Sequence, residues 1–226
     1  PTQLTDGLVL GAVLSREDPR DILVSQDGSK LEDLSPGTKI GTSSPRRAAQ
    51  LKKYAPQVEV VSIRGNVETR LRKAQGDEAE GAVLAAAGMI RLGLQEQITE
   101  YLPITQFVPP PGQGILAVEA RADDHRMLRL LSAIDDLDTR LEATAERTFL
   151  AELGGGCSVP VGAYAQCTGM DILMTIFMST EDGAKSVTTQ VKGPKEDALG
   201  IANAAYQALK REGGADLVAA AKANQS

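Results

Sequence analysis

Apolar residues in the first half of the chain come in short runs, and each run is followed by a polar segment of helical length. The runs 58–63 ("VEVVSI") and 81–88 ("GAVLAAAG") predict strands, and another strand begins at 39–41. Ser44, as N-cap before Pro45, predicts a helix, and a second helix is expected over 67–74. "MIRLGL", from residue 89, starts a third helix. This alternation predicts an α/β domain with a parallel sheet in which 81–88 is a buried strand.

The second half of the chain has a different order of elements. "LPITQFVPPPGQG" (102–114) contains four prolines and is interpreted as a crossing linker. Strands in succession with flanking helices then predict a separate small α+β domain. We expect strands at 115–120, 160–166, 171–178 and 185–192, and helices at 124–133, 138–152 and 195–211.

Composition narrows the class of protein. The 226 residues are 42% hydrophobic and contain two cysteines and one histidine, His125. Two cysteines could form one pair but no disulfide framework, so we expect a reduced, cytosolic protein. No cluster of His, Cys and carboxylates has metal-ligand spacing, so no metal is expected. No apolar run has the length of a membrane span, and no signal peptide is recognised, although the chain begins without methionine.

Charge is concentrated in one segment. Residues 39–73 carry nine basic side chains and two acidic ones, whereas the whole chain has a net charge of −6. A basic block in an otherwise acidic protein suits a localised anionic ligand better than a nucleic-acid surface.

The basic block places polar groups where predicted strands end. "GTSSPRR" gives the hydroxyls of Thr42, Ser43 and Ser44 beside a helix N-terminus, followed by the guanidinium groups of Arg46 and Arg47. Helix N-termini and arginines both bind anions. The same residues could instead be a helix cap followed by a solvent-exposed basic helix.

The next two junctions repeat this arrangement. Arg64 ends one strand, Asn66 can cap the following helix, and Arg70 lies further along it. Arg91 follows the third strand, three residues after Gly88. Because the carboxyl ends of parallel strands share one edge, these arginines should converge on one cleft that suits a ligand with several carboxylates.

The stretch "LGGGCSVPVG" (153–162) puts Cys157 after three glycines. Together with "GTSSPRRAAQL", "SIRGNVETRL", "AAAGMIRLGL" and "PPPGQGILAVEAR", it resembles the porphobilinogen deaminase family, also called hydroxymethylbilane synthases. The resemblance covers essentially the whole chain, with the motifs in the family's order. It implies lobes like those of periplasmic binding proteins and a small C-terminal α+β domain that carries a cysteine-bound dipyrromethane cofactor.

The resemblance also implies a function and roles for residues. The family condenses four porphobilinogen molecules into hydroxymethylbilane, with release of ammonia. Cys157 matches the thioether attachment position of the cofactor, while Cys167 has no match and is expected to be a small core residue. Arg64 and Arg70 are the catalytic residues that the resemblance implies in this chain, and they would serve the incoming substrate or the elongation site. The expected cofactor contacts are Thr42, Ser43, Ser44, Arg46, Arg47, Asn66 and Gly88, and the expected substrate contacts are Arg64, Arg70, Arg91 and Gln113.

The family's catalytic aspartate lies in a Lys-Asp-Val-Pro motif, and the first residues of the chain resemble the family's segment directly after that motif. We therefore expect most of domain one to lie outside this sequence and residues 1–226 alone to lack activity. The expected division is a domain-one remnant and hinge (1–19), domain two (20–108), a return segment (109–137) and domain three (138–226). Residues 1–15 and about 109–134 would expose apolar edges without their partner strands. The complete enzyme is expected to be a cytoplasmic monomer that binds neither nucleic acid nor membrane, with organellar targeting left open.

Three other functions are weighed against this one. A non-catalytic binder of a small anion would use the arginines but has no need of Cys157. A nucleic-acid-binding domain is disfavoured by an aromatic content of 3%. A hydrolase is disfavoured because no catalytic motif surrounds His125.

Overall fold

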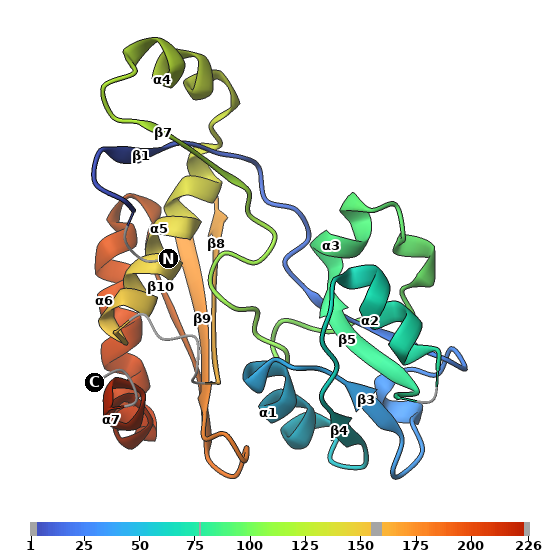
Figure 1. Cartoon of the computed structure of the whole chain (residues 1–226). Coiled ribbons are helices and arrows are strands. Elements are labelled where there is room, and N and C mark those ends of the chain that lie inside the picture. Colours follow the sequence, from blue (N-terminus) through green and yellow to red (C-terminus); the bar gives the residue numbers. More distant parts are fainter. Residues whose placement is uncertain (1–3, 77, 155–159, 224–226) are drawn as a thin grey trace.

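The computed structural model describes residues 4–76, 78–154 and 160–223, and these form three β-sheets (Figure 1). A five-stranded sheet lies in the first half of the chain and a three-stranded sheet in the second half. A two-stranded sheet joins residues near the start of the chain to the segment between the two larger sheets. The predicted class, an α/β lobe followed by a small α+β unit, is confirmed. Among the described residues, no helix is both long and apolar enough to cross a membrane.

The five-stranded sheet has a parallel centre. Its order is β4 (Glu59–Val61), β3 (Lys39–Gly41), β5 (Gly81–Ala85), β2 (Asp21–Ser25) and β6 (Glu100–Tyr101). Strand β3 is parallel to β4 and β5, but β2 is antiparallel to β5 and β6. The three strands that the sequence predicts are parallel, as expected, whereas β2 was not predicted as a strand and runs in the opposite direction. The inverted strand matters for the site, because its first residue lies at the carboxyl ends of β3 and β5.

Helices cover both faces of this sheet. Successive residues of β2 point to opposite sides, so Ile22 enters a core with α2 (Val67–Ala74) and α3 (Ala86–Arg91). Leu23 enters the other core, with α1 (Pro45–Tyr54). The predicted starts of α1 and α2 are confirmed: the side chains of Ser44 and Asn66 each accept a hydrogen bond from the backbone N–H three residues on.

The apolar run 81–88 is not one strand. Strand β5 ends at Ala85, and α3 begins at Ala86 rather than at Met89. Alanine favours helices more than strands, so the three-alanine stretch allows the change from strand to helix inside an apolar run. Two short 3-10 helices, η1 (Leu31–Asp33) and η2 (Gln95–Gln97), complete this half.

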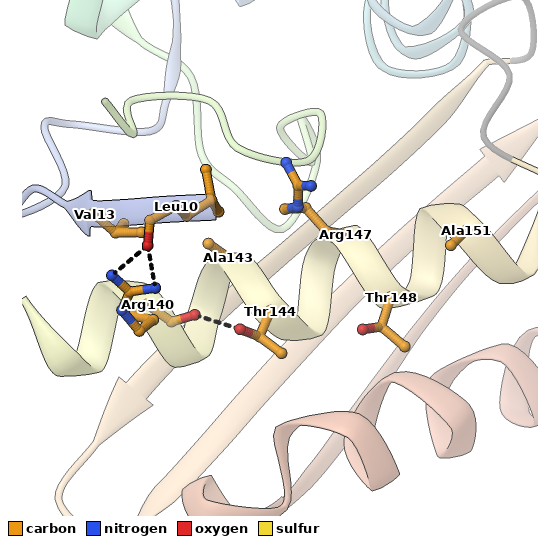
Figure 2. Close-up of a pocket in the computed structure, with 8 residues that line it drawn as sticks. All are labelled: Leu10, Val13, Arg140, Ala143, Thr144, Arg147, Thr148 and Ala151. Carbon is orange, nitrogen blue, oxygen red and sulfur yellow. Dashed lines mark hydrogen bonds between the residues drawn. The ribbon is translucent and has the colours of Figure 1, made fainter. Parts of the chain in front are cut away.

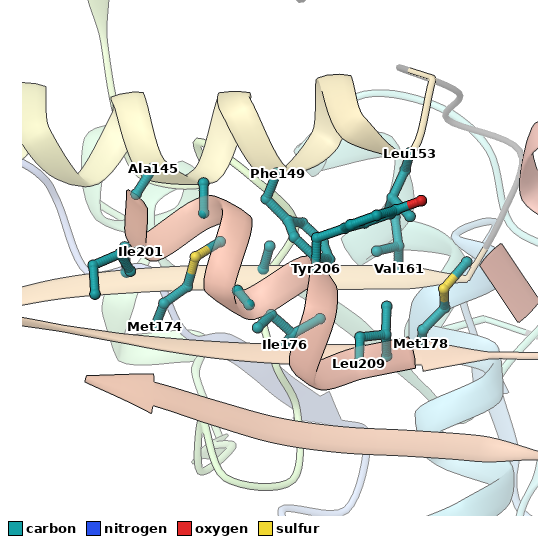
Figure 3. Packing of buried hydrophobic residues seen from close by; sticks show 14 of the residues in the cluster. Ala145, Phe149, Leu153, Val161, Met174, Ile176, Met178, Ile201, Tyr206 and Leu209 are labelled. Carbon is teal, nitrogen blue, oxygen red and sulfur yellow. The ribbon is translucent and has the colours of Figure 1, made fainter. Parts of the chain in front are cut away.

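The C-terminal unit is an antiparallel meander covered by helices. Strands β8 (Val161–Thr168), β9 (Asp171–Ser179) and β10 (Ser186–Pro194) pair in the order β10-β9-β8. Figure 3 shows Phe149 of α5 and Ile201 of α6 packing over Met174 and Ile176. Helix α7 was not predicted. The helices and turns here are α5 (Leu137–Glu152), η4 (Lys195–Asp197), α6 (Ala198–Leu209), η5 (Lys210–Gly214) and α7 (Ala215–Ala223).

The segment between the larger sheets pairs with the start of the chain. Strand β1 (Leu8–Val13) is antiparallel to β7 (Ala117–Arg121), and α4 (His125–Leu131) and η3 (Ser132–Ile134) follow. The expectation that these segments expose apolar surface agrees with Leu116, Leu130 and Ile134, which are all about half exposed or more. The two segments nevertheless provide one strand partner for each other.

Candidate functional site

The carboxyl ends of β4, β3 and β5 lie at one edge of the sheet, because these three strands are parallel and adjacent. Thr42 follows β3, Arg64 follows β4, and Gly88 lies in the helix that follows β5. The structure therefore brings together the three junctions that the sequence singles out. The start of β2 reaches the same edge because β2 runs in the opposite direction.

The hydroxyl loop after β3 is held by its own hydrogen bonds. Buried Thr42 donates its backbone N–H to the Val61 carbonyl (2.9 Å), and its Oγ1 accepts from the Ser44 N–H (3.2 Å). Ser44 Oγ accepts in turn from the Arg47 N–H (3.4 Å) as the cap of α1. Ser43 is exposed between them. The loop thus presents Ser43 to solvent, while its neighbours fix the helix start.

Arg46 and Arg47 are buried, with 4% and 7% of their surface exposed. A solvated basic helix is therefore wrong for these two residues. Arg46 Nη1 donates to Asp21 Oδ2 at 2.7 Å, and Arg47 donates to Asp21 Oδ1 from Nη2 at 2.8 Å and from Nε at 3.0 Å. We call Asp21, Arg46 and Arg47 the Asp21 cluster. Two arginines and one carboxylate give it a net charge of +1.

Asp21 was not among the predicted site residues, and in the sequence it is only the last polar residue before the apolar run "ILV". It is completely buried. Burial by itself raises the pKa of a carboxyl, but Arg46 and Arg47 outweigh that effect and lower the pKa of Asp21 to about 2. Burial lowers the pKa of Arg46, and the nearby Asp21 opposes this shift.

The other predicted arginines are more accessible. Arg64 is exposed, and half-buried Arg70 donates from Nε to the Gly65 carbonyl (2.8 Å) on the turn before α2. Arg91, also exposed, donates from Nη2 to the Gly114 carbonyl (2.8 Å). Gly88 of α3 faces α2, since a Cβ built on it would lie 3.4 Å from Val67 Cγ2.

Gln113 joins the Asp21 cluster to the linker. Its Nε2 donates to the Pro19 carbonyl (2.7 Å) and to Asp21 Oδ1 (3.0 Å), and its Oε1 accepts from Arg47 Nη2 (3.3 Å). Its carbonyl accepts from Arg16 Nε (2.9 Å). The predicted cleft residue is thus bonded to two members of the cluster.

A second buried ion pair, also absent from the sequence interpretation, connects the linker to α5. Arg16 Nη1 donates to Glu146 Oε1 at 2.7 Å, and the Gly112 N–H donates to Glu146 Oε2 at 2.6 Å. The guanidinium also lies 4.8 Å from the centre of the Tyr164 ring, and Glu142 lies 3.5 Å from Nη1. Burial raises the pKa of both Glu142 and Glu146, against the attraction of Arg16.

The structure describes only one of the two cysteines, Cys167. Cys157 lies outside the described residues. Cys167 packs against the C-terminal core with its Sγ 3.6 Å from the Asp138 carbonyl, and burial raises the pKa of its thiol to about 11. A thiol with so high a pKa is a poor nucleophile.

A cavity of about 210 Å³ lies between β1 and α5, and none of the predicted site residues lines it. Figure 2 shows the residues that do line it. Its wall includes Arg140, which is paired with Asp135 (2.6 Å) and donates to the Leu10 carbonyl. Among the described residues, no group of three or more His, Cys, Asp and Glu could hold a metal ion.

Comparison with known proteins agrees with the predicted resemblance. Residues 1–129 match the family model described as "Porphobilinogen deaminase, dipyromethane cofactor binding domain", and residues 140–210 match the model of the C-terminal domain of the same enzyme. The chain is 43% identical to the porphobilinogen deaminase of Brevibacillus brevis, covering 97% of this chain and 71% of the relative. It is 44% identical to that of a Roseiflexus species, covering 97% and 72%.

One solved structure, a lipoprotein of the YaeC family from Enterococcus faecalis, aligns with 66% of this chain and 68% of its own. Its sequence identity of 14% and TM-score of 0.36 are too low to support an argument about this chain.

Proposed function

The chain belongs to the porphobilinogen deaminase family, and from this membership we propose how its residues divide the work. The family's activity is that of a transferase in tetrapyrrole biosynthesis, which condenses four porphobilinogen molecules into hydroxymethylbilane and releases ammonia. Its cofactor-binding domain takes a dipyrromethane. The assignment of particular residues to cofactor and substrate is our proposal.

The charges at the sheet edge suit this cofactor. Each of its pyrrole rings carries an acetate and a propionate, and the Asp21 cluster keeps one net positive charge beside the loop with Ser43. Arg46 Nε is buried and has no acceptor among the described residues. A buried donor without a partner costs about 1–3 kcal/mol, which an incoming carboxylate would recover. The cluster therefore fits a carboxylate-bearing ligand.

We assign Arg46 and Arg47, with the loop before them, to the cofactor, and the more accessible arginines to the substrate. When bound, the dipyrromethane supplies the pyrrole carbon to which the chain of rings is joined. Cys157, outside the described residues, would hold it through a thioether. The proposed cofactor contacts are Thr42, Ser43, Ser44, Arg46, Arg47, Asn66 and Gly88.

The more accessible arginines would bind substrate carboxylates. Arg64 is exposed, and Arg70 and Arg91 each use one donor on a backbone carbonyl, which orients the guanidinium and leaves its other donors for a ligand. Fixed guanidinium groups bind carboxylates with two parallel hydrogen bonds. Gln113, which touches Asp21 and Arg47, would complete the substrate side.

The observation that carries the proposal is the convergence of three basic junctions at one sheet edge, on the background of the family match. Intact-mass measurement of the full-length protein tests it. We expect an adduct of dipyrrole mass that is lost in Cys157→Ser and kept in the matched control Cys167→Ser. An unmodified wild-type protein, or an adduct that survives Cys157→Ser, would contradict the assignment.

We also propose that the complete enzyme is a cytoplasmic monomer that acts on a small molecule, with neither nucleic acid nor membrane as partner. The low aromatic content and the net positive charge of residues 39–73 in an otherwise acidic chain support a small anionic ligand rather than nucleic acid. The division into domain two (20–108) and domain three (138–226) is likewise proposed. The five-stranded and three-stranded sheets, which lie inside these limits, support it.

A further inference from the structure

Asp21 lies where one carboxylate reaches both arginines at the start of α1. Oδ2 accepts from Arg46 Nη1 at 2.7 Å, and Oδ1 accepts from Arg47 Nη2 at 2.8 Å. The antiparallel direction of β2 makes this possible, because Asp21 pairs with Ala85, the last residue of β5. The first residue of β2 thus sits beside the carboxyl ends of the parallel strands.

Each guanidinium is held by more than Asp21. Arg46 Nη1 also donates to Gln50 Oε1 and to the Val108 carbonyl, both at 2.8 Å. Arg47 Nη2 also donates to Gln113 Oε1, and Arg47 Nη1 donates to the Val83 carbonyl, both at 3.3 Å. The two cations therefore have fixed orientations, and Asp21 is the acceptor that they share.

Resting on the proposed function, we propose that Asp21 is a positioning residue: it aligns Arg46 and Arg47 for a ligand carboxylate and reduces the charge of the cluster from +2 to +1. Two aligned arginines with one net charge select a carboxylate by geometry. Two arginines without Asp21 would attract small anions of any shape. Asp21 thus lowers the affinity of the cluster for anions in general and raises its selectivity for a carboxylate.

The test compares three variants of the full-length protein. Asp21→Asn keeps the size of the side chain and removes its charge. Asp21→Asn combined with Arg46→Gln returns the cluster to a charge of +1. Asp135→Asn is the matched control, because it also breaks a short aspartate–arginine pair, with Arg140 (2.6 Å), away from the sheet edge.

Two readouts separate positioning from simple stability. The first is the fraction of protein that carries the dipyrromethane adduct, from intact mass. The second is the affinity for inorganic phosphate of cofactor-free protein in a Cys157→Ser background, from the rise in melting temperature with phosphate concentration. If the role of Asp21 were only structural, its replacement would lower cofactor loading in step with stability. It would not strengthen phosphate binding.

For Asp21→Asn we expect cofactor loading about tenfold lower and phosphate affinity about tenfold higher than in the wild type. The double variant should return phosphate affinity to the wild-type value, and Asp135→Asn should change neither readout. Unchanged phosphate affinity in Asp21→Asn, or an equal rise in Asp135→Asn, would overturn the proposal.

If Asp21→Asn does not fold, the test rests on the double variant. Cofactor loading equal to that of the wild type in the double variant would refute the positioning role. Absence of the adduct from the wild-type protein would refute the proposed function instead. In that case the phosphate comparison still decides the role of Asp21.

Discussion

Replacing Glu146 by leucine should lower the free energy of unfolding, because Glu146 is fully buried and holds the linker to α5. Its carboxylate accepts from Arg16 Nη1 (2.7 Å) and from the backbone N–H groups of Gly112 (2.6 Å) and Ala165 (2.8 Å). Leucine fills a similar volume but accepts no hydrogen bond. Arg16 would lose its closest carboxylate, and the buried Ala165 N–H and the half-buried Gly112 N–H would lose their acceptor.

The cost follows from these contacts. Removing one partner of a buried ion pair typically costs about 3–5 kcal/mol. Glu142, 3.5 Å from Arg16, compensates part of the charge, so we expect Glu146→Leu to cost about 3–4 kcal/mol. Arg16→Met should cost less, since Glu146, whose pKa burial already raises, can bind a proton. The double variant should cost at least about 2 kcal/mol less than the sum of the single ones.

Urea unfolding followed by circular dichroism measures these values, and the absence of tryptophan makes fluorescence a poor probe. The control is Lys195→Met. It removes an ion pair of the same length, 2.7 Å, between Lys195 and Asp138, and Asp138 lies near the surface on the same helix, α5. It should lower the free energy of unfolding far less than Glu146→Leu, because solvent screens an exposed ion pair. If Glu146→Leu cost no more than this control, or if the two single costs simply added, the reasoning would be refuted.

Three further predictions concern other parts of the molecule. The pKa of Asp21, about 2, lies below the ordinary 3.8, so its ionised form should add about 2 kcal/mol to the free energy of unfolding above pH 4. This contribution should be lost as the pH falls towards 2, and unfolding titrations of Asp21→Asn should not show it. Gly162→Ala would place a Cβ 2.5 Å from the Val108 carbonyl oxygen and should cost about 1–3 kcal/mol of unfolding free energy, whereas Gly76→Ala, with an ordinary 3.5 Å contact, should cost nothing measurable. A thiol pKa of about 11 in place of 9.0 lowers the thiolate fraction of Cys167 at pH 8 roughly a hundredfold. Iodoacetamide should therefore modify Cys167 more slowly in the folded than in the unfolded protein, and an equal rate by peptide mass analysis would contradict this.

Local signals in the sequence predicted the elements that depend on local interactions. Ser44 and Asn66 cap α1 and α2 because their side chains bond to backbone groups three residues away. The direction of β2 has no such signal, because it depends on pairing with β5, some sixty residues away. Helix α7 was missed because the glycines of "REGG" predict a helix end. A positive φ at Gly213 (95°) does interrupt the helix, but the nine residues of α7 follow as a further helix.

The sequence indicates which residues gather at the site but not which carboxylate pairs with which arginine. Parallel strands bring the residues that follow them to one edge, so the convergence of Arg46, Arg64 and Arg91 could be inferred from order alone. Burial of an arginine depends on which carboxylate meets it, and that carboxylate is distant in sequence. Asp21 lies 25 residues before Arg46, and Glu146 lies 130 residues after Arg16. No local pattern relates such pairs.

Burial separates the arginines of this protein into two kinds. Arg16, Arg46 and Arg47 are each paired with a buried carboxylate, whereas Arg64 and Arg91 are exposed. An exposed arginine binds a carboxylate weakly, since water competes and the long side chain must be ordered. A buried one binds strongly only if its orientation is already fixed, and Asp21 meets that condition for two arginines at once. Under the proposed assignment, selectivity for the first carboxylate would therefore reside in the buried pair, and the exposed arginines would accept successive carboxylates without holding any of them tightly.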